Sequence, residues 1–386
     1  MVKHTLWLFL LIGLLLTGCA PKELPQDTVP NTTPAATPAP TPVPEDPVQL
    51  LLDSLTLEEK VGQLFMVRPE SLGIKDDPAN VTQQLLQQYP VGGIMVAGSN
   101  IVNEEQIVAF NEAFQKASKI PLLISTDEEG GIVARFANHR AFQLPKYESA
   151  GAVGASEDPD DALQMGATIG AYLSNYGVNM DLAPVADVNT NPNNPVIGTR
   201  AFSSDASVAA KMANAMAIGL HQAGIIPTYK HFPGHGDTAE DSHSRLAVSY
   251  KTEEELLSCE WLPYKNLGTD RCVMVAHVAL PNVTGNMTPA TLSKEILQGI
   301  LRQKLGFAGV IITDAMEMGA IANTYPSGEA AVLAIQAGCD IILCPYDFTA
   351  AYDAVLEAAK NGTLTQERID ESVYRILTLK RAYGLG

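Results

Sequence analysis

The sequence of 386 residues is poor in basic side chains: 25 Lys and Arg stand against 43 Asp and Glu, a net charge of -18. Nucleic-acid-binding proteins usually present a basic face, so this balance argues against a nucleic-acid partner. Aromatic residues make up only 6% of the chain, which argues against a long aromatic-lined groove but is compatible with a compact pocket. No G-x-G-x-x-G motif follows an early predicted strand, so a dinucleotide site is disfavoured and we expect no cofactor.

Cysteine is also scarce, with 5 residues and no C-x-x-C pair. Cys339 and Cys344 flank one apolar run, and in an extended strand they would lie roughly 16 Å apart at about 3.3 Å per residue. A disulfide requires Cα atoms within about 7 Å of each other. We therefore predict that these two thiols, together with Cys259 and Cys272, are free and mostly buried.

The first apolar run, residues 6–16, is shorter than the roughly 20 residues that cross a bilayer. It follows a charged start and precedes small residues, which is typical of a secretion signal. The residues Leu16-Thr17-Gly18-Cys19 resemble a bacterial lipobox, in which the Cys is lipidated and begins the mature protein. We therefore predict a lipoprotein signal peptide (1–19) with Cys19 as the lipidation site, and anchoring at the outer face of the bacterial cell membrane. A plain signal peptide is the alternative.

Residues 20–47 are rich in Pro and Thr and carry almost no large apolar side chains. Such a segment cannot bury a core, and its Pro content favours an extended, semi-rigid tether. A tail without a spacing role is the alternative. The remaining residues, 48–386, are long enough for one large α/β barrel or about two smaller domains.

Short apolar runs alternate with longer amphipathic ones through residues 48–386. Continuous apolar strands alternating with helices indicate a parallel sheet covered on both faces. Eight such units predict a single (β/α)₈ barrel domain of the α/β class, with a doubly wound open sheet as the alternative. The predicted strands are residues 61–67, 91–96, 121–125, 178–185, 225–229, 272–277, 309–313 and 340–344. The predicted helices are residues 48–60, 104–118, 160–176, 205–223, 252–266, 290–304, 328–337, 350–360 and 366–382.

Ionisable residues gather just beyond these predicted strands. The densest stretch, residues 230–243, holds three of the 7 His together with two Asp, a Glu and a Lys. In a barrel of this kind the carboxyl ends of all strands meet at one mouth, so we expect the site there. The other strand ends contribute Asp127, Glu128, Glu129, Asp187, Arg200, His277 and Asp314.

Asp314 directly follows a buried strand, where an unpaired carboxylate in the core would be costly. We predict that it faces the mouth as a nucleophile; the alternative is a helix N-cap. In Asp241-Ser242-His243, an extended backbone would place the carboxylate and the imidazole on one face. Such a His can give a proton and take one back near neutral pH, which together with Asp314 allows a two-step displacement. The alternative is a solvated loop His bonded to a local Asp.

The spacing His231-x₃-His235 could bind zinc if the segment were helical. Pro233, Gly234 and Gly236 argue against a helix, so we predict no metal. A metal-dependent barrel hydrolase remains an alternative to the two-step displacement.

Four motifs occur in order along the chain: D-x-E-G-G at Asp127, K-H-F-P-G-H-G-D-T at Lys230, D-S-H at Asp241 and I-T-D-A-M-E-M around Asp314. Together they resemble glycoside hydrolase family 3, and more narrowly its β-N-acetylglucosaminidase (NagZ-like) branch, over about residues 48 to 386. The resemblance implies a (β/α)₈ barrel and retaining hydrolysis of terminal, non-reducing β-linked N-acetylglucosamine.

The resemblance also implies roles for single residues. Asp314 matches the nucleophile of the family, and Asp241 with His243 matches the acid/base dyad of this branch. Many family members carry a further domain that supplies a Glu as the acid; we expect none here, which is consistent with a loop-borne His. Positions that match sugar- and N-acetyl-binding residues are Asp127, Arg200, Lys230 and His231, with Arg135 in the same motif as Asp127.

We therefore expect a monomeric enzyme whose carbohydrate substrates are cell-wall (peptidoglycan) fragments. Besides the metal-dependent hydrolase, three alternatives remain open. The chain could be a phosphorylase, because a neutral His repels phosphate less than a carboxylate does. It could be a broader β-glycosidase of the same family, or a non-catalytic sugar-binding lipoprotein, although the latter usually has two lobes.

Overall fold

The computed structural model describes residues 46–385. The predicted signal peptide with Cys19 lies outside this part of the chain, as does the predicted tether apart from its last two residues. No helix within the described part is both long and apolar enough to cross a membrane.

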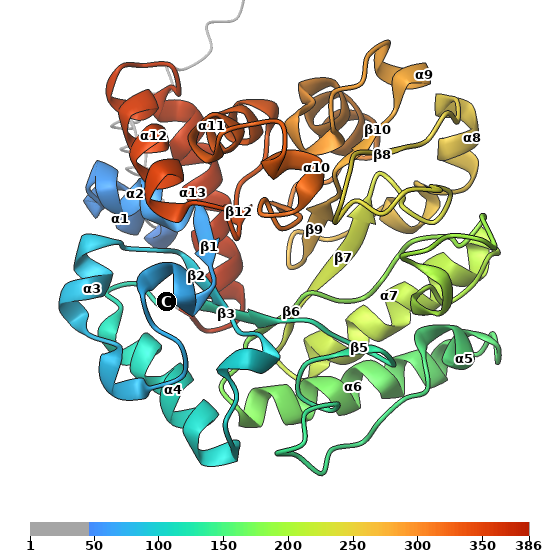
Figure 1. The fold of residues 1–386 in the computed structure, drawn as a ribbon, viewed down its shortest axis with the longest axis horizontal. Helices are drawn as coiled ribbons and strands as arrows, with labels where there is room; N and C mark the ends of the chain where they lie inside the picture. The colour runs from blue at the N-terminus through green and yellow to red at the C-terminus, as the bar shows by residue number, and fades with distance from the viewer. Residues whose placement is uncertain (1–45, 386) are drawn as a thin grey trace, which may run out of the picture. The chain divides into compact units, whose positions relative to one another are not determined.

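Eight short parallel strands form one sheet that closes on itself (Figure 1). Around the sheet the order is β11, β9, β7, β6, β3, β2, β1 and β12, and a parallel bridge between Ile312 and Ile341 joins the two ends. The predicted barrel is therefore confirmed, and the open doubly wound alternative is wrong. The strands are β1 (Phe65–Val67), β2 (Gly93–Met95), β3 (Leu123–Thr126), β6 (Met180–Asp181), β7 (Ile226–Phe232), β9 (Cys272–Val275), β11 (Val310–Thr313) and β12 (Ile342–Leu343).

Helices surround the barrel and follow the strands in sequence (Figure 1). The α-helices are α1 (Pro47–Ser54), α2 (Leu57–Gln63), α3 (Gln83–Gln88), α4 (Glu104–Ala117), α5 (Ala150–Gly154), α6 (Pro159–Asn175), α7 (Ala206–Gln222), α8 (Glu253–Ser258), α9 (Pro281–Thr284), α10 (Gly319–Ala322), α11 (Ser327–Ala337), α12 (Phe348–Lys360) and α13 (Gln366–Ala382). A π-helix, η7 (Glu295–Lys304), takes the place of an α-helix before β11. Short 3₁₀ helices are η1 (Pro69–Leu72), η2 (Pro78–Asn80), η3 (Gly98–Asn100), η4 (Gly198–Arg200), η5 (Leu262–Tyr264) and η6 (Ala290–Leu292).

The first predicted helix and strand have different boundaries in the structure. A capping box interrupts the predicted helix 48–60, since Thr56 accepts the Glu59 N–H while the Glu59 carboxylate accepts the Thr56 N–H. A new helix, α2, therefore begins there and extends through Gln63, so that only the end of the predicted strand 61–67 is extended. The capping box at Thr56 thus favours a helix at Val61, although a β-branched residue in an apolar run favours a strand.

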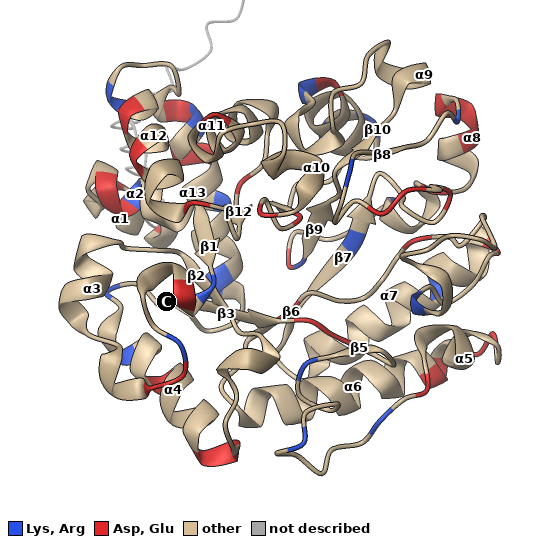
Figure 2. Ribbon diagram, in the orientation of Figure 1, with Lys and Arg blue, Asp and Glu red and all other residues tan. Residues whose placement is uncertain are grey.

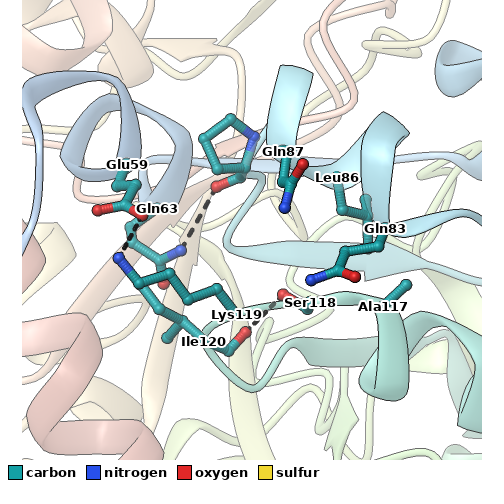
Figure 3. Close-up of a pocket in the computed structure, with 10 residues that line it drawn as sticks. Glu59, Gln63, Gln83, Leu86, Gln87, Ala117, Ser118, Lys119 and Ile120 are labelled. Atoms are coloured by element: carbon teal, nitrogen blue, oxygen red, sulfur yellow. Dashed lines mark hydrogen bonds and ion pairs between the residues drawn. The ribbon is translucent and has the colours of Figure 1, made fainter.

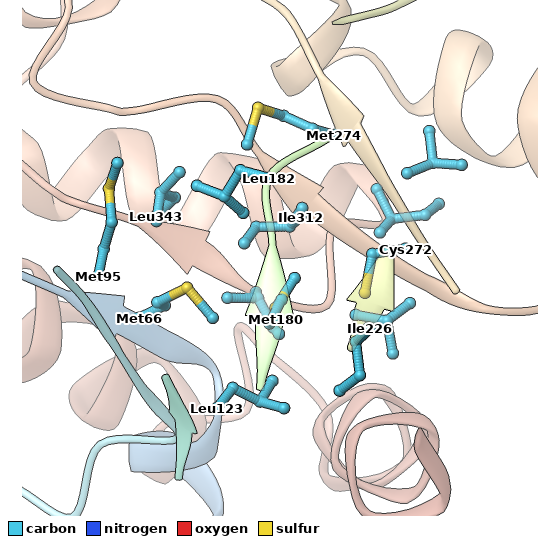
Figure 4. Packing of buried hydrophobic residues seen from close by; sticks show 14 of the residues in the cluster. Met66, Met95, Leu123, Met180, Leu182, Ile226, Cys272, Met274, Ile312 and Leu343 are labelled. Atoms are coloured by element: carbon cyan, nitrogen blue, oxygen red, sulfur yellow. The ribbon is translucent and has the colours of Figure 1, made fainter. Parts of the chain in front are cut away.

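Four methionine side chains lie among the buried residues of the barrel core (Figure 4). Met66, Met95, Met180 and Met274 are at most 5% exposed and pack among aliphatic side chains from neighbouring strands. Unbranched thioether side chains adapt to irregular space, which suits the centre of a closed barrel. The interior is therefore a packed core below the mouth, and not a channel.

Two small sheets are formed by segments that follow strands of the barrel. The antiparallel hairpin of β4 (Glu128–Gly130) and β5 (Val133–Ala134) follows β3 directly. The parallel pair of β8 (Ala247–Val248) and β10 (Val278–Ala279) connects the segments that follow β7 and β9.

Acidic residues are spread over the outer helices and loops (Figure 2).

The four Cys residues in the described part of the chain are free thiols, and three of them are buried while Cys259 is half-buried. The prediction of free, mostly buried thiols is confirmed for these four residues.

Glycine allows α6 and α7 to approach each other closely. A Cβ on Gly219 of α7 would lie 2.1 Å from the Leu163 carbonyl oxygen of α6, and a Cβ on Gly166 would lie 2.1 Å from the Met216 carbonyl oxygen. Real Cβ atoms do not approach backbone this closely, so any larger side chain must push the helices apart.

We expect the substitution Gly219→Ala to destabilise the protein by about 1–3 kcal/mol, because the added methyl group overlaps backbone atoms of α6. Gly299→Ala is the matched control: it lies in η7, and its Cβ would meet no atom within 4 Å. That variant should be more stable than the wild type by roughly 0.5–1 kcal/mol. Urea unfolding of the three proteins measures both effects, and equal stabilities for the two variants would contradict the close packing of α6 on α7.

Candidate active site

A cavity of about 200 Å³ opens at the carboxyl ends of the barrel strands. It brings together seven of the eight side chains that the sequence assigned to catalysis or substrate binding, and the eighth, Asp241, bonds to one of them. The seven are Asp127, Arg135, Arg200, Lys230, His231, His243 and Asp314.

A second hollow, of about 220 Å³, lies at the opposite end of the barrel (Figure 3). Gln63, Pro90 and Ile120 line it just before β1, β2 and β3 begin, and a Glu59–Lys119 ion pair of 2.5 Å crosses one side. No residue of the four sequence motifs lines this hollow. The site therefore belongs to the mouth.

A buried ammonium group forms the centre of the mouth. The Lys230 Nζ lies 2.9 Å from Asp127 Oδ1 and 2.6 Å from Glu129 Oε1, and its side chain is 3% exposed. Burial alone would lower the pKa of Lys230, but the two carboxylates outweigh burial and raise the pKa above its usual value. Arg200 completes the network by donating from Nε and Nη2 to the two oxygens of Glu129, at 2.8 and 2.7 Å.

The two carboxylates of this network stay ionised. Burial opposes their charge, yet Lys230 and Arg135 lower the pKa of Asp127, and Lys230 and Arg200 lower the pKa of Glu129. Arg135 reaches Asp127 Oδ2 at 3.2 Å from the end of the β4–β5 hairpin, and its side chain remains 42% exposed. The cavity thus presents fixed charges and many directed hydrogen-bond donors and acceptors.

Glu128, between these two carboxylates, points away from the cavity, as alternation along a strand requires. It accepts hydrogen bonds from the Phe136 and Ala137 N–H groups at 2.8 Å each, and from the Tyr172 hydroxyl at 2.8 Å. Its own N–H donates to Asp181. Burial raises the pKa of Glu128. These bonds fix the hairpin that carries Arg135.

His231 lies in β7 itself, since this strand extends to Phe232; the prediction that residues 230–243 lie beyond the strand is wrong for the first of them. The His231 Nδ1 lies 2.6 Å from Asp187 Oδ2, and its Nε2 lies 3.3 Å from Arg200 Nη2. Because a guanidinium only donates, we assign the proton to Nδ1 and the acceptor role to Nε2. Asp187 therefore fixes both the tautomer and the ring orientation.

Asp314 follows β11 directly and is half-buried at the cavity wall. Its Oδ1 accepts the Ala315 N–H at 2.8 Å, while its backbone N–H donates to Val275 at 2.8 Å. The next helix, α10, begins at Gly319 with Met318 at the cap position, so the alternative of an N-cap role for Asp314 is wrong.

His277 holds the segment that follows Asp314. It is fully buried, with Nε2 3.1 Å from the Ala315 carbonyl oxygen and Nδ1 2.8 Å from Thr291 Oγ1. Burial lowers the pKa of His277. A neutral ring that donates from Nε2 to Ala315 and accepts at Nδ1 from Thr291 satisfies both contacts.

The predicted contact between Asp241 and His243 is confirmed, but its cause is different. Asp241 Oδ1 accepts from both Nδ1 and the backbone N–H of His243, at 2.7 and 2.9 Å. The backbone is a turn and is not extended, because the Ser244 and Arg245 N–H groups both donate to the Asp241 carbonyl. Partial burial opposes ionisation of Asp241, but the bonds from His243 lower the pKa of its carboxyl.

The turn of residues 241–245, called the dyad turn below, is hydrogen-bonded to the segment that carries Asp314. The Gly319 N–H donates to the His243 carbonyl at 3.0 Å, and the Asn323 side chain donates to the Ser244 carbonyl at 3.3 Å. The side chains of His243 and Asp241 remain 65% and 46% exposed. The backbone of the turn is therefore fixed while the imidazole stays accessible from the cavity and from solvent.

His235 supports the same loop and does not pair with His231 as a zinc site. Its Nε2 lies 2.8 Å from Ser242 Oγ and its Nδ1 lies 2.7 Å from Thr238 Oγ1, so both ring nitrogens have partners. Burial lowers the pKa of His235. Within residues 46–385 no three His, Cys, Asp or Glu side chains are placed to hold a metal ion.

Four further residues of the site had no predicted role. Glu129 and Asp187 were noted only as polar strand-end residues, although they hold Arg200, Lys230 and His231 in place. Arg68 and Glu317 line the cavity as well, with Arg68 Nη2 2.7 Å from Glu317 Oε1. Arg68 follows β1 directly, so the strand-end rule alone would have identified it.

We expect Lys230→Met to destabilise the protein by about 3–5 kcal/mol at pH 7, because Asp127 and Glu129 would lose a buried counter-charge. Lys119→Met is the control: its ion pair with Glu59 is exposed on the Lys side (66%) and should contribute within about 1 kcal/mol. In the wild type, the ionised Asp127 and Glu129 stabilise the fold at neutral pH, and their protonation in acid removes this stabilisation. The difference in unfolding free energy between the wild type and Lys230→Met should therefore become smaller below about pH 4. Urea unfolding at several pH values measures these free energies. A stability difference between the wild type and Lys230→Met that does not change with pH would contradict the ionised network.

Comparison with known proteins is consistent with this geometry. The sequence model of "Glycosyl hydrolase family 3 N terminal domain" matches residues 56–379. The chain is similar to beta-hexosaminidase LpqI of Mycobacterium tuberculosis, at 32% identity over 340 residues that cover 84% of this chain and 83% of that protein. It is also similar to beta-hexosaminidase A of Pseudoalteromonas piscicida, at 32% identity over 77% of this chain but 54% of that protein.

Two solved structures are similar in fold and sequence. A glycoside hydrolase family 3 beta-N-acetylglucosaminidase from Paenibacillus sp. str. FPU-7 has a TM-score of 0.81 and 39% identity, covering 86% of this chain and 63% of that chain. Beta-glucoside phosphorylase BglX bound to 2FGlc has a TM-score of 0.77 and 31% identity, covering 88% of this chain and 61% of that chain. The chain thus spans about half to two thirds of several of these relatives. The match over residues 56–379, in a barrel of the same architecture, shows that the chain belongs to glycosyl hydrolase family 3.

Proposed function

We propose that the protein is a retaining exo-β-N-acetylglucosaminidase that removes terminal, non-reducing β-linked N-acetylglucosamine, and that its natural substrates are peptidoglycan fragments. The observation that carries the proposal is the convergence of Asp314 and His243 on one cavity. They come from different strand ends and are held together by the bond from Gly319 to His243. The names of the similar proteins support the same activity.

The size of the cavity supports removal of single terminal sugars. Its volume of about 200 Å³ is below the roughly 300–1,000 Å³ of pockets for drug-sized ligands. The β4–β5 hairpin closes one side, and the dyad turn crosses from β7 to α10 on the other. A cavity of this size fits one sugar ring with its substituent, with the remainder of the substrate outside.

In the first chemical step, a carboxylate oxygen of Asp314 attacks C1 of the bound sugar as the bond from C1 to the leaving oxygen breaks. His243 transfers its proton to that oxygen, while Asp241 stabilises the imidazole. In the second step, water attacks C1 and gives a proton to His243. The bond between C1 and Asp314 breaks, which regenerates the ionised carboxylate and retains the configuration at C1.

The ion network supplies the binding groups for the sugar. Asp127 and Glu129 face Lys230, Arg200 and Arg135, so the charges of this wall nearly balance. Hydroxyl groups donate and accept hydrogen bonds, and an acetamide carbonyl accepts them, so both can bind to such a wall without adding a net charge. His231, oriented by Asp187, accepts from Arg200 through Nε2 and so helps to hold this guanidinium at the wall.

A phosphorylase is the second candidate, because one of the similar structures is a beta-glucoside phosphorylase. A neutral His243 would repel phosphate less than a carboxylate base would. If phosphate replaced water in the second step, the product would be a sugar 1-phosphate. Assays with and without inorganic phosphate separate the two reactions by product.

We expect Asp314→Ala to lower turnover of an aryl β-N-acetylglucosaminide on the order of 10⁴-fold or more, because the nucleophile is lost. His243→Ala should lower turnover by roughly 10²–10⁴-fold when the leaving group is poor, and far less when it is a nitrophenolate, which needs no proton. Rates across a series of leaving groups measure this difference. His221→Ala, with a surface imidazole bonded to Tyr383, is the control and should retain wild-type rates. Equal losses for His243→Ala on both kinds of leaving group would contradict its role as the acid.

We propose that the protein is exported and anchored by a lipid on Cys19, on the support of the lipobox at residues 16–19. The wild type expressed in bacteria should partition into the membrane fraction and incorporate a labelled fatty acid. Cys19→Ser should incorporate none. Labelling of the Cys19→Ser variant to the wild-type level would refute lipidation at this residue.

A further inference from the structure

The wall of the cavity opposite the sugar-binding network carries a second ion pair. In the closed order of the barrel, β1 lies four strands from β7 in either direction, so the two strands face each other (Figure 1). Arg68 follows β1, whereas Lys230 and His231 lie in β7. Arg68 and Glu317 therefore approach the cavity from the side that the proposed sugar contacts leave open.

The Arg68 guanidinium is held along one edge only. Its Nε and Nη2 both donate to Glu317 Oε1, at 3.0 and 2.7 Å. Its Nη1 has no hydrogen-bond partner within residues 46–385, so the other edge, made by Nη1 and Nη2, is available to a ligand. A guanidinium edge binds a carboxylate through two parallel hydrogen bonds.

Stability does not explain the pair. The side chains of Arg68 and Glu317 are 31% and 37% exposed, and ion pairs at such positions contribute little to folding. The pair does hold a cation at the cavity of a chain whose net charge is -18. The other buried cations there, Lys230 and Arg200, are already committed to carboxylates.

The position of Glu317 indicates which part of a substrate the pair meets. Glu317 lies between Asp314 and Gly319, and the Gly319 N–H holds the His243 carbonyl. The nucleophile directly precedes this segment, and the far end of the segment is bonded to the turn that carries the acid. Arg68 and Glu317 line the same cavity as both groups, so a leaving group on the side of the acid can reach them.

We propose that Arg68 is a specificity residue that binds a carboxylate on the leaving-group sugar, and that Glu317 is the positioning residue that orients the guanidinium. This inference rests on the proposed glycosidase activity and deepens it. Substrates with an acidic sugar after the scissile bond, as in peptidoglycan, are then preferred to neutral ones, as in chitin.

The test compares three substrates that share a terminal β-N-acetylglucosamine: a disaccharide with N-acetylmuramic acid, the same disaccharide with its lactyl carboxylate as a methyl ester, and a nitrophenyl glycoside. We expect Arg68→Met to lower kcat/KM for the acid roughly 10- to 100-fold, the range for a lost hydrogen bond to a charged group. The ester and the nitrophenyl glycoside should change less than about threefold, since neither presents a carboxylate to Arg68.

Two further variants separate recognition from structure. Arg68→Lys keeps the charge but not the paired donors, and should restore part of the preference for the acid over the ester. Glu317→Gln keeps an oxygen acceptor for Arg68 and removes a negative charge, and should retain or increase that preference. The wild-type preference should fall as salt is raised.

The outcomes distinguish this inference from the proposed function. If the wild type does not cleave the nitrophenyl glycoside, the glycosidase proposal itself fails. If the wild type cleaves all three substrates but Arg68→Met lowers all three rates equally, the carboxylate subsite is refuted while the glycosidase proposal stands. A selective loss for the acid with Arg135→Met instead would place the carboxylate at the hairpin and would equally refute the assignment to Arg68.

Discussion

The site depends on a single ammonium group buried between two carboxylates. Lys230 joins Asp127 at the end of β3 to Glu129 in the hairpin that follows, and Glu129 in turn holds Arg200 from the β6–α7 connection. A buried charge is tolerated only when it is paired and hydrogen-bonded, so these segments can take few other arrangements. The network therefore shapes one wall of the cavity before any substrate is present.

The catalytic pair is held differently. Asp314 stands on a segment fixed by His277 and by strand hydrogen bonds, whereas His243 stands on an exposed turn that three hydrogen bonds join to α10 and its cap. The rigid element thus carries the group that forms the covalent bond, and the more exposed element carries the group that exchanges protons with solvent. This division suits a reaction in which water must enter after the leaving group has departed.

Much of this arrangement could be predicted from the sequence, because apolar runs of four to eight residues identify buried strands and strand ends identify the mouth. All eight strands lie within or overlap the predicted runs. The errors concern local chemistry that periodicity does not report. The capping box at Thr56 starts a new helix that extends into a predicted strand. A turn, and not an extended segment, joins Asp241 to His243. Strand β7 continues through Lys230 and His231 because the network satisfies their polar side chains. Arg68 stands outside the four motifs and was missed for that reason, although it directly follows a predicted strand.

The burial of the thiols has a consequence for the compartments in which the protein can persist. Cys272, Cys339 and Cys344 are at most 1% exposed, and burial raises the pKa of each thiol. Nucleophilic attack on a disulfide or a peroxide requires an accessible thiolate, which these side chains do not provide. Even the half-buried Cys259 has its pKa raised to about 11 by burial. The folded barrel thus protects its own sulfhydryl groups, and it needs neither a reducing environment nor a disulfide to remain intact where oxidants are present.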